Sequence, residues 1–251
     1  MAARTWGWRV YGLGVIHLAV VALVIGSFLP GQSVPKDFPA RTALAYAAAI
    51  FLLAGGLALE WRRTAGWAAA ALAAYYGVIV VLVMDARLIV AHPLVYGGYE
   101  NLGEQLAMAA GALIIYAAFA ELDLRRRATL TRIGQVVFGV CAVIFGGAHF
   151  AYMELTAPLV PQWLPPSQLF WGYATGVFHI AGGLAIIAGV QARLAAILLT
   201  VMYALFAPLV HLPAILAHPA DSGVWIENAA NLALVGVAWV VADSLATPRP
   251  A

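Results

Sequence analysis

The chain carries little charge for its length. Of its 251 residues, 13 are Lys or Arg and 11 are Asp or Glu, so charged residues make up only 10%. Soluble domains average about a quarter. Hydrophobic residues reach 64% and the mean hydropathy is +0.92. The surface of a soluble domain cannot be built from so few charges, and the composition therefore predicts an integral membrane protein with the lipid bilayer as its surroundings.

Cysteine and the familiar enzyme motifs are also scarce. The single cysteine, Cys141, excludes an intrachain disulfide and with it a stapled secreted domain. The net charge of +2 comes from a few dispersed arginines, so we expect no nucleic-acid partner. The sequence contains no Gly-rich phosphate loop, no nucleophile motif and no paired-cysteine or His-Glu-x-x-His metal signature.

Long apolar runs are what the chain has instead. A helix rises about 1.5 Å per residue, so about 20 apolar residues cross a hydrocarbon core roughly 30 Å thick. We expect the first run to be a span and not a signal peptide, because it exceeds the usual signal core of about 7–15 residues. The sequence predicts an all-α polytopic membrane protein with eight spans, near Gly7–Leu29, Thr42–Glu60, Thr64–Met84, Asn101–Glu121, Leu130–Met153, Gln168–Ala188, Ala192–Val210 and Glu227–Leu245.

The arginines give the expected orientation. Cytoplasmic loops of membrane proteins carry an excess of Lys and Arg. On one face lie Arg4, Arg9, Arg62, Arg63, Arg125, Arg126, Arg127, Arg132, Arg193 and Arg249, whereas the opposite face has only Lys36, Arg41 and Arg87. We therefore predict that both termini are cytoplasmic, in the cytoplasmic membrane of a bacterium.

Two internal similarities predict a repeat. The segment "AYAAAIFLLAGGLALE" (Ala45–Glu60) resembles "GYATGVFHIAGGLAII" (Gly172–Ile187). Likewise "LIVAHPLVYGGYEN" (Leu88–Asn101) resembles "AILAHPADSGVWIEN" (Ala214–Asn228), which pairs Glu100 with Glu227. We expect two parallel four-helix repeats, residues 1–127 and 128–251, related by a pseudo-two-fold axis along the membrane normal.

Polar residues are concentrated in the second half. His179 is expected near the bilayer midplane, where an ionisable side chain is a functional candidate. We predict that His149, His179, His211 and Glu227 converge on one pocket in the outer half of the second repeat. His179 and Glu227 are the candidate catalytic residues, and the candidate binding residues are His149, Glu154, Trp171, His211, Asn228 and Asn231. A proline-rich stretch, Leu159–Tyr173, is expected to form a lid.

Each candidate also has a structural explanation. His179 can be a neutral core histidine bonded to a backbone carbonyl. Glu227, expected in a first helical turn, can stabilise the helix by interacting with the helix dipole. His211 and His218 lie at helix ends, where a histidine often only hydrogen-bonds water.

The second half also carries a family resemblance. A four-helix unit with "FWGYATGVFHIAGGLAIIAG" (Phe170–Gly189), followed by "ARLAAILLT" (Ala192–Thr200) and "VHLP", resembles the DoxX-like family of bacterial membrane proteins over Leu130–Leu245. The stretch Tyr11–Glu121 looks like a diverged second copy. The resemblance implies a compact four-helix bundle per copy and, in the namesake members, the membrane part of a thiosulfate:quinone oxidoreductase.

Three classes of function remain open at this point. One is the membrane component of a quinone-linked oxidoreductase, in which quinone and a partner redox subunit take part and His179 and Glu227 exchange protons. A second is a non-catalytic factor that binds a partner, a lipid or a metal. His149, His179 and His211 are possible ligands of a haem or of copper in such a factor. A transporter is disfavoured, because the inner halves of these helices carry few polar residues to continue a path.

Overall fold

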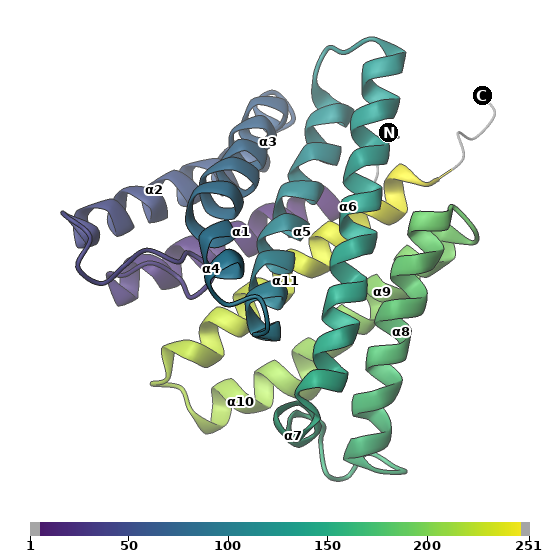
Figure 1. Ribbon diagram of the computed structural model, residues 1–251. Coiled ribbons are helices and arrows are strands. Elements are labelled where there is room, and N and C mark those ends of the chain that lie inside the picture. Colours follow the sequence, from purple (N-terminus) through teal and green to yellow (C-terminus); the bar gives the residue numbers. More distant parts are fainter. Residues whose placement is uncertain (1–5, 247–251) are drawn as a thin grey trace.

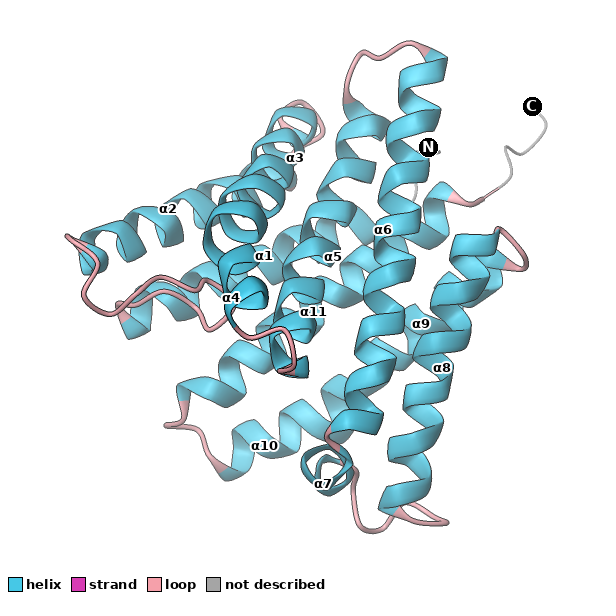
Figure 2. Cartoon of the chain, in the orientation of Figure 1, coloured by secondary structure: helices cyan, strands magenta, loops and turns pink. Residues whose placement is uncertain are grey.

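The computed structural model describes residues 6–246, and within this range the chain forms helices and no strand (Figures 1 and 2). The first half contains α1 (Gly7–Ile25), α2 (Arg41–Leu59), α3 (Ala65–Ala74), the π-helical segment η1 (Tyr75–Asp85), α4 (Ala86–Ala91) and α5 (Tyr96–Phe119). The second half contains α6 (Leu124–Ala151), α7 (Met153–Thr156), the 3-10 turn η2 (Ala157–Leu159), α8 (Gln168–Ala188), α9 (Ala192–Phe206), the π-helical segment η3 (Ala207–His211), α10 (Leu212–Ala217) and α11 (Ser222–Ser244).

Eight of the helices in the described range are long and apolar enough to cross a membrane, which confirms the predicted fold class. The third span is the continuous run Ala65–Ala91, in which α3, η1 and α4 follow one another. The seventh is Ala192–Ala217, in which α9, η3 and α10 do the same.

Several predicted span boundaries were wrong by up to seven residues, and local chemistry explains the differences. The Asp123 carboxylate accepts a hydrogen bond from Arg126 N at 2.8 Å and so begins α6 at Leu124, six residues before the apolar run. Asp221 caps α11 through Gly223 N in the same way. Glu227 therefore lies in the second turn of α11, not at its start as predicted.

The helices of the two halves pack in the same order. In the first half α1 packs on α2, α2 on α3 and α3 on α5. In the second half α6 packs on α8, α8 on α9 and α9 on α11. The halves meet where α1 packs on α11, where α5 packs on α6 and where α5 crosses α11. The loop between the halves follows Phe119, so the predicted boundary after residue 127 falls inside α6.

Glycines with equivalent positions in the two halves have equivalent neighbours. A Cβ on Gly12 would lie 3.3 Å from the Gly56 carbonyl oxygen, and one on Gly139 would lie 2.9 Å from the Gly183 carbonyl oxygen. The glycine just before Gly56 and the one just before Gly183 (Gly55 and Gly182) each face a leucine of the following span. These contacts agree with the predicted repeat, while the orientation of an axis relative to the membrane stays a prediction.

One predicted correspondence between residues of the two halves differs by one position in the structure. Tyr99 donates its hydroxyl to the Pro93 carbonyl at 3.0 Å, and Trp225 donates its indole N–H to the Pro219 carbonyl at 3.0 Å. Both bonds span six residues, so they align α5 and α11 with Asn101, and not Glu100, opposite Glu227. The third span is one residue longer than the seventh, and both contain a π-helical segment, which can accommodate an extra residue.

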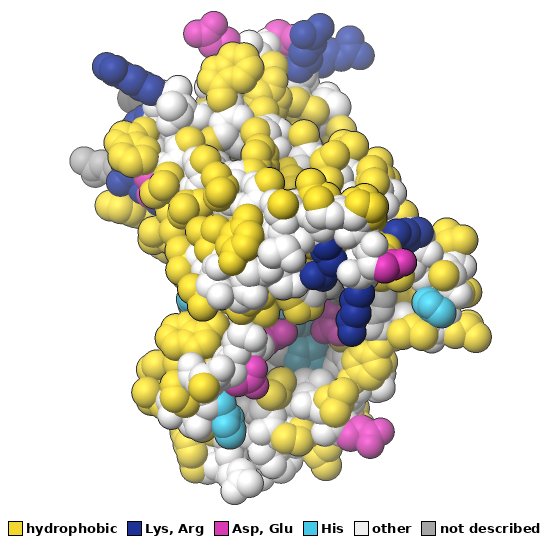
Figure 3. Space-filling model, turned by 90° about the vertical axis from the view of Figure 1, so that its left-hand side faces the viewer, with side chains coloured by type: hydrophobic (Ala, Val, Ile, Leu, Met, Phe, Trp, Pro, Cys, Tyr) yellow, Lys and Arg dark blue, Asp and Glu magenta, His cyan; other side chains and the backbone are white. Residues whose placement is uncertain are grey.

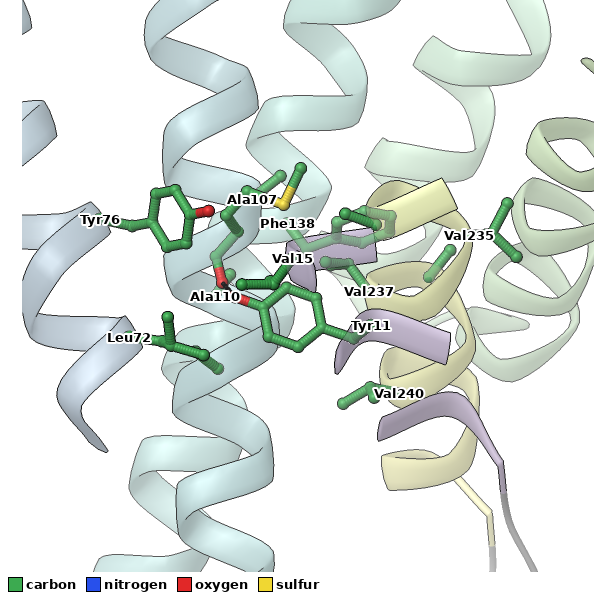
Figure 4. Close-up of a cluster of buried hydrophobic side chains, with 14 of the residues drawn as sticks. Tyr11, Val15, Leu72, Tyr76, Ala107, Ala110, Phe138, Val235, Val237 and Val240 are labelled. Carbon is green, nitrogen blue, oxygen red and sulfur yellow. Dashed lines mark hydrogen bonds between the residues drawn. The ribbon is translucent and has the colours of Figure 1, made fainter. Parts of the chain in front are cut away.

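The core lies where α1, α5 and α11 meet (Figure 4). Tyr11 and Tyr76 enter it from α1 and η1, and both are almost completely buried. The Tyr11 hydroxyl donates to the Met108 carbonyl at 3.0 Å and ties α1 to α5. A Cβ on Gly236 would overlap the Tyr11 backbone, so α11 approaches α1 closely only because this position has no side chain.

The connections alternate between two ends of the bundle. The arginine-containing connections after α2, α5 and α8 share one end with the start of α1 and the end of α11 (Figure 1). Arg4 and Arg249 lie outside the described residues. Which end faces the cytoplasm stays a prediction, and we call the arginine-poor end the outer end below.

We predict that a reporter joined after Ala246 is active only if it is a type that functions in the cytoplasm. The reason is that α11 ends at the same end of the bundle as the arginine-rich connections. Alkaline phosphatase, which needs export, should be inactive there and active when inserted after Pro93. Phosphatase activity at the C-terminal position would contradict the orientation.

We predict that Gly183→Ala destabilises the protein, because the new Cβ would overlap the Gly139 carbonyl oxygen and push α6 and α8 apart. Overpacking of this kind costs about 1–3 kcal/mol. The control is Gly77→Ala, whose Cβ would lie at an ordinary 3.6 Å from Ala109 Cβ. Unfolding in mixed micelles measures both variants, and equal stabilities would contradict the role of this crossing.

Candidate functional site

A polar cavity lies between the two halves of the molecule, toward the outer end. Its volume is about 90 Å³, room for a few water molecules. The loop before α2 and the helices α1, η1, α5 and α11 contribute to its wall. We call it the central cavity, and its lining residues are Leu18, Leu29, Pro30, Gly31, Gln32, Tyr76, Asn101, Glu104, Gln105, Met108, Ile226, Glu227 and Ala230.

Carboxyl groups dominate the electrostatics of this cavity. Glu104 lies within electrostatic range of Glu227, Glu100 and Asp85. It is the ninth residue of α5, about 12 Å along the helix from its outer end, and so it lies well inside the membrane span. Glu227 lines the same cavity but is exposed, which places it at the mouth. On the face in Figure 3 the molecule is hollowed, and acidic and histidine side chains gather in the hollow.

Amide and phenol groups complete the polar lining. Gln105 Nε2 donates to Glu104 Oε1 at 3.4 Å. Gln32 Nε2 donates to the Tyr75 hydroxyl at 2.9 Å, and its Oε1 accepts from Leu29 N at 3.3 Å, so it fixes the loop against η1. Tyr76 lines the cavity, and its buried hydroxyl has no hydrogen-bond partner within residues 6–246.

The loop over the cavity is held by charged residues of the third span. Asp85 is 2% exposed and accepts from Ser33 N at 3.4 Å and from Asn101 Nδ2 at 3.5 Å. Arg87 donates to the Ser33 carbonyl. A Cβ on Gly31 would overlap the Gln105 amide, so the loop can lie this close to α5 only with glycine at that position.

His149 and His179 form a separate pair in the second half. Their ring centroids are 5.3 Å apart, and the ring of His179 also packs near Phe145, Tyr203 and Phe206. His179 is 3% exposed, and its Nδ1 lies 2.9 Å from the Thr175 carbonyl oxygen. This is the core-histidine arrangement considered above. His149 Nδ1 is buried and has no hydrogen-bond partner in the part of the chain that the structure describes.

The predicted convergence on one pocket is therefore incomplete. His149 and His179 lie together as expected, but Glu227 lines the central cavity, whose wall contains no histidine among the described residues. The reason is that α11 begins at Ser222 and packs on α1 and α5 as well as on α9, so its outer turns face the first half too. His211 ends η3 and is half-buried.

Asn231 has a structural task in the seventh span. Tyr203 lies in the last turn of α9, just before the π-helical segment η3. Asn231 Nδ2 donates to the Tyr203 carbonyl at 3.0 Å and supplies a donor there. Asn231 is 6% exposed, so one of its amide hydrogens is committed to the backbone, while its binding role stays a prediction.

An apolar groove runs beside the same π-helical segment. It has a volume of about 450 Å³, and its walls are Ala207, Pro208, Leu212, Ile215, Trp225 and Asn228. Asn228 is the polar side chain among these, apart from the indole N–H of Trp225, which donates to the Pro219 carbonyl. Leu212 and Leu216, next to the groove, are 51% and 74% exposed, which is expected of side chains that face lipid.

Two predicted binding residues lie elsewhere. The indole N–H of Trp171 donates to the Pro165 carbonyl at 2.8 Å. Together with a bond from Gln168 Nε2 to the Val160 carbonyl at 2.5 Å, it holds the proline-rich stretch against α8. Glu154 is exposed in the short helix α7. Within residues 6–246, no group of three or more His, Cys, Asp or Glu side chains is arranged to hold a metal ion.

The sequence contained a signal for the central cavity that our prediction did not use. Glu104 and Gln105 lie inside an apolar run, and an ionisable residue at that depth is a functional candidate by the same argument that was applied to His179. Gln32 and Tyr76 could not be found this way. A tyrosine in an apolar helix is common, so Tyr76 carries no signal. The loop before α2, which contains Gln32, has no sequence pattern that predicts its position over the cavity.

The comparisons with known proteins add one similarity. Residues 138–242 match a family described as a domain of unknown function (DUF8561). The match covers the second half of α6, all of α7, α8, α9 and α10, and most of α11. No curated protein and no solved structure matches the chain. These findings neither support nor contradict the DoxX-like resemblance.

We predict that Asn231→Leu destabilises the protein by about 1–3 kcal/mol, because it leaves the Tyr203 carbonyl without this donor in an apolar interior. Asn228→Leu is the matched control: it is three residues away on the same helix, with its side chain on the groove. Unfolding in mixed micelles compares the two. A loss for Asn228→Leu as large as that for Asn231→Leu would contradict the assignment.

Proposed function

We propose that this protein binds the head group of a quinone in the apolar groove of its second half, as the membrane component of a quinone-linked oxidoreductase. The observation that carries the proposal is the groove itself. Its volume of about 450 Å³ falls within the range of small-molecule sites, and it combines apolar walls with one amide.

The residues of the groove match the chemistry of a quinone ring. Trp225 and Leu212 offer apolar surface to the ring and the first part of its tail, while the Asn228 amide can donate to a ring oxygen. The exposed leucines beside the groove place it against lipid, from which a quinone would enter. A proline-interrupted π-helical segment forms one wall, and π-helical turns often occur at functional sites.

Reduction of a quinone to a quinol takes up two electrons and two protons. Glu227 precedes Asn228 in the chain and lies at the mouth of the central cavity, so it is the carboxyl group that we assign to proton exchange with the outer side. The electrons come from a partner redox subunit or a reduced substrate. His179 has no role in this proposal, because its ring is packed among aromatic side chains and bonded to Thr175.

The DoxX-like resemblance of the second half supports a redox function, since the namesake members belong to a thiosulfate:quinone oxidoreductase. A second candidate is a non-catalytic factor that binds a partner protein. It is favoured by one observation, the exposure of Leu155, Leu159 and Trp163 between α6 and α8, at 71%, 57% and 72%.

We predict that a short-chain quinone quenches the tryptophan fluorescence of the purified protein saturably, with a large share of the quenching lost in Trp225→Phe. Asn228→Leu should weaken binding about 2- to 12-fold, the effect of one hydrogen bond of 0.5–1.5 kcal/mol. Thr200→Val is the control, because its hydroxyl donates to the Ala196 carbonyl within α9 and does not line the groove.

Quenching that rises linearly with quinone, as simple partition into detergent would give, contradicts the proposal. So does unchanged affinity in Asn228→Leu. The partner-binding candidate predicts instead a stable complex with another protein that is lost in Trp163→Ala and is insensitive to quinone.

A further inference from the structure

The central cavity lies outside the groove and the proposed quinone reaction gives it no ligand of its own. We propose that it is a binding site for a small monovalent cation, such as sodium, potassium or ammonium, held by oxygen atoms of both halves. The proposal rests on the charge of the cavity, on its oxygen donors and on one buried hydroxyl group without a partner. It does not depend on the quinone proposal.

The charge of the cavity favours a cation. Glu104 and Glu227 both line it, with Glu100 and Asp85 in electrostatic range of Glu104. The one Lys or Arg ion pair found among the described residues joins Arg126 to Asp123 at the opposite end of the molecule. Arg87 interacts electrostatically with Asp85 and donates to the Ser33 carbonyl in the loop over the cavity. Like charges in a site of low dielectric constant repel one another strongly, and a bound cation would offset that repulsion.

The donor atoms fit a hard cation. One volume is lined by five residues whose side chains carry oxygen atoms: the carboxyl residues Glu104 and Glu227, the amides Asn101 and Gln105, and Tyr76. Oxygen ligands of this kind suit alkali and alkaline-earth ions more than transition metals. Three of these five side chains are neutral, and the volume of about 90 Å³ holds an ion with one or two waters. Mg²⁺ gives up its water reluctantly, so a monovalent ion fits this set better.

Tyr76 is the independent observation that points to a ligand. Tyr76 lines the cavity and is 2% exposed, and its buried hydroxyl oxygen has no hydrogen-bond partner among the described residues. Figure 4 shows the hydroxyl directed from η1 toward α5. Buried polar groups are nearly always satisfied, so an unpartnered hydroxyl at a polar cavity indicates that something else occupies the space.

The loop before α2 closes the site toward the outer end. Gly31 and Gln32 are buried, and Gln32 is fixed by its bonds to Leu29 N and the Tyr75 hydroxyl. The mouth at Glu227 remains exposed, so a cation can enter past that carboxylate.

The test compares thermal unfolding of the full chain in detergent, at constant pH and ionic strength, with sodium, potassium or ammonium chloride replacing choline chloride. Choline is too large for the cavity. At a cation concentration one hundred times Kd, we expect Tm to rise by about 5–10 °C with at least one of the three ions, with saturation. The ion that gives the largest rise identifies the ligand among the three sources.

Two variants locate the site. Tyr76→Phe keeps the buried ring and removes only the hydroxyl, and it should weaken the cation dependence several-fold. Glu104→Gln should abolish it. Glu154→Gln, an exposed carboxylate in α7, should leave it intact. If Glu104→Gln does not fold, Tyr76→Phe alone decides.

Identical Tm values in all four salts would overturn the proposal, since the carboxyl groups would then be neutralised by protons and the cavity would hold only water. A cation effect retained in full by Tyr76→Phe and Glu104→Gln would also overturn it, because the ion would then bind elsewhere.

Discussion

The whole architecture depends on close approach between helices at small residues. In a bilayer there is no hydrophobic force that draws apolar helices together, so packing at short range must hold them. Gly12 and Gly56 let α1 lie against α2, and Gly139 and Gly183 let α6 lie against α8. Gly236 then lets α11 lie against the Tyr11 backbone of α1 and joins the two halves. Every polar site described here lies between helices that these contacts position.

The same packing determines which polar groups meet. In the membrane interior polar groups need hydrogen-bond partners, and Asn231 Nδ2 donates to the Tyr203 carbonyl in the last turn of α9. Asn231 is thus occupied, while Asn228, almost one turn earlier on α11, lines the groove. Glu227 faces the central cavity together with Glu104 from the other half. Three polar residues of one helix thereby belong to three different environments, and only the surrounding helices distinguish them.

The fold was largely predictable and the site was not. Eight spans and their order follow from long apolar runs, because hydrophobic length is a direct requirement of the bilayer. Span ends were less accurate, since capping by Asp123 and Asp221 extends α6 and α11 into polar sequence. The pairing of His149 with His179 followed from helical periodicity and depth. The position of Glu227 depends on how α11 packs between the two halves, and the inserted loop at Gly31 depends on contacts far along the chain. Periodicity carries no information about either.

The central claim is that Glu227 and the histidine pair belong to two separate sites, a cavity between the halves and an aromatic cluster within the second half. A density map of the protein in lipid nanodiscs, at a resolution that shows side chains, tests this most directly. The account predicts that the Glu104 and Glu227 carboxyl groups face one volume beneath Gly31, with the His149 and His179 rings packed together outside it. A map in which Glu227 contacts the histidine pair, with the loop at Gly31 away from α5, would contradict it.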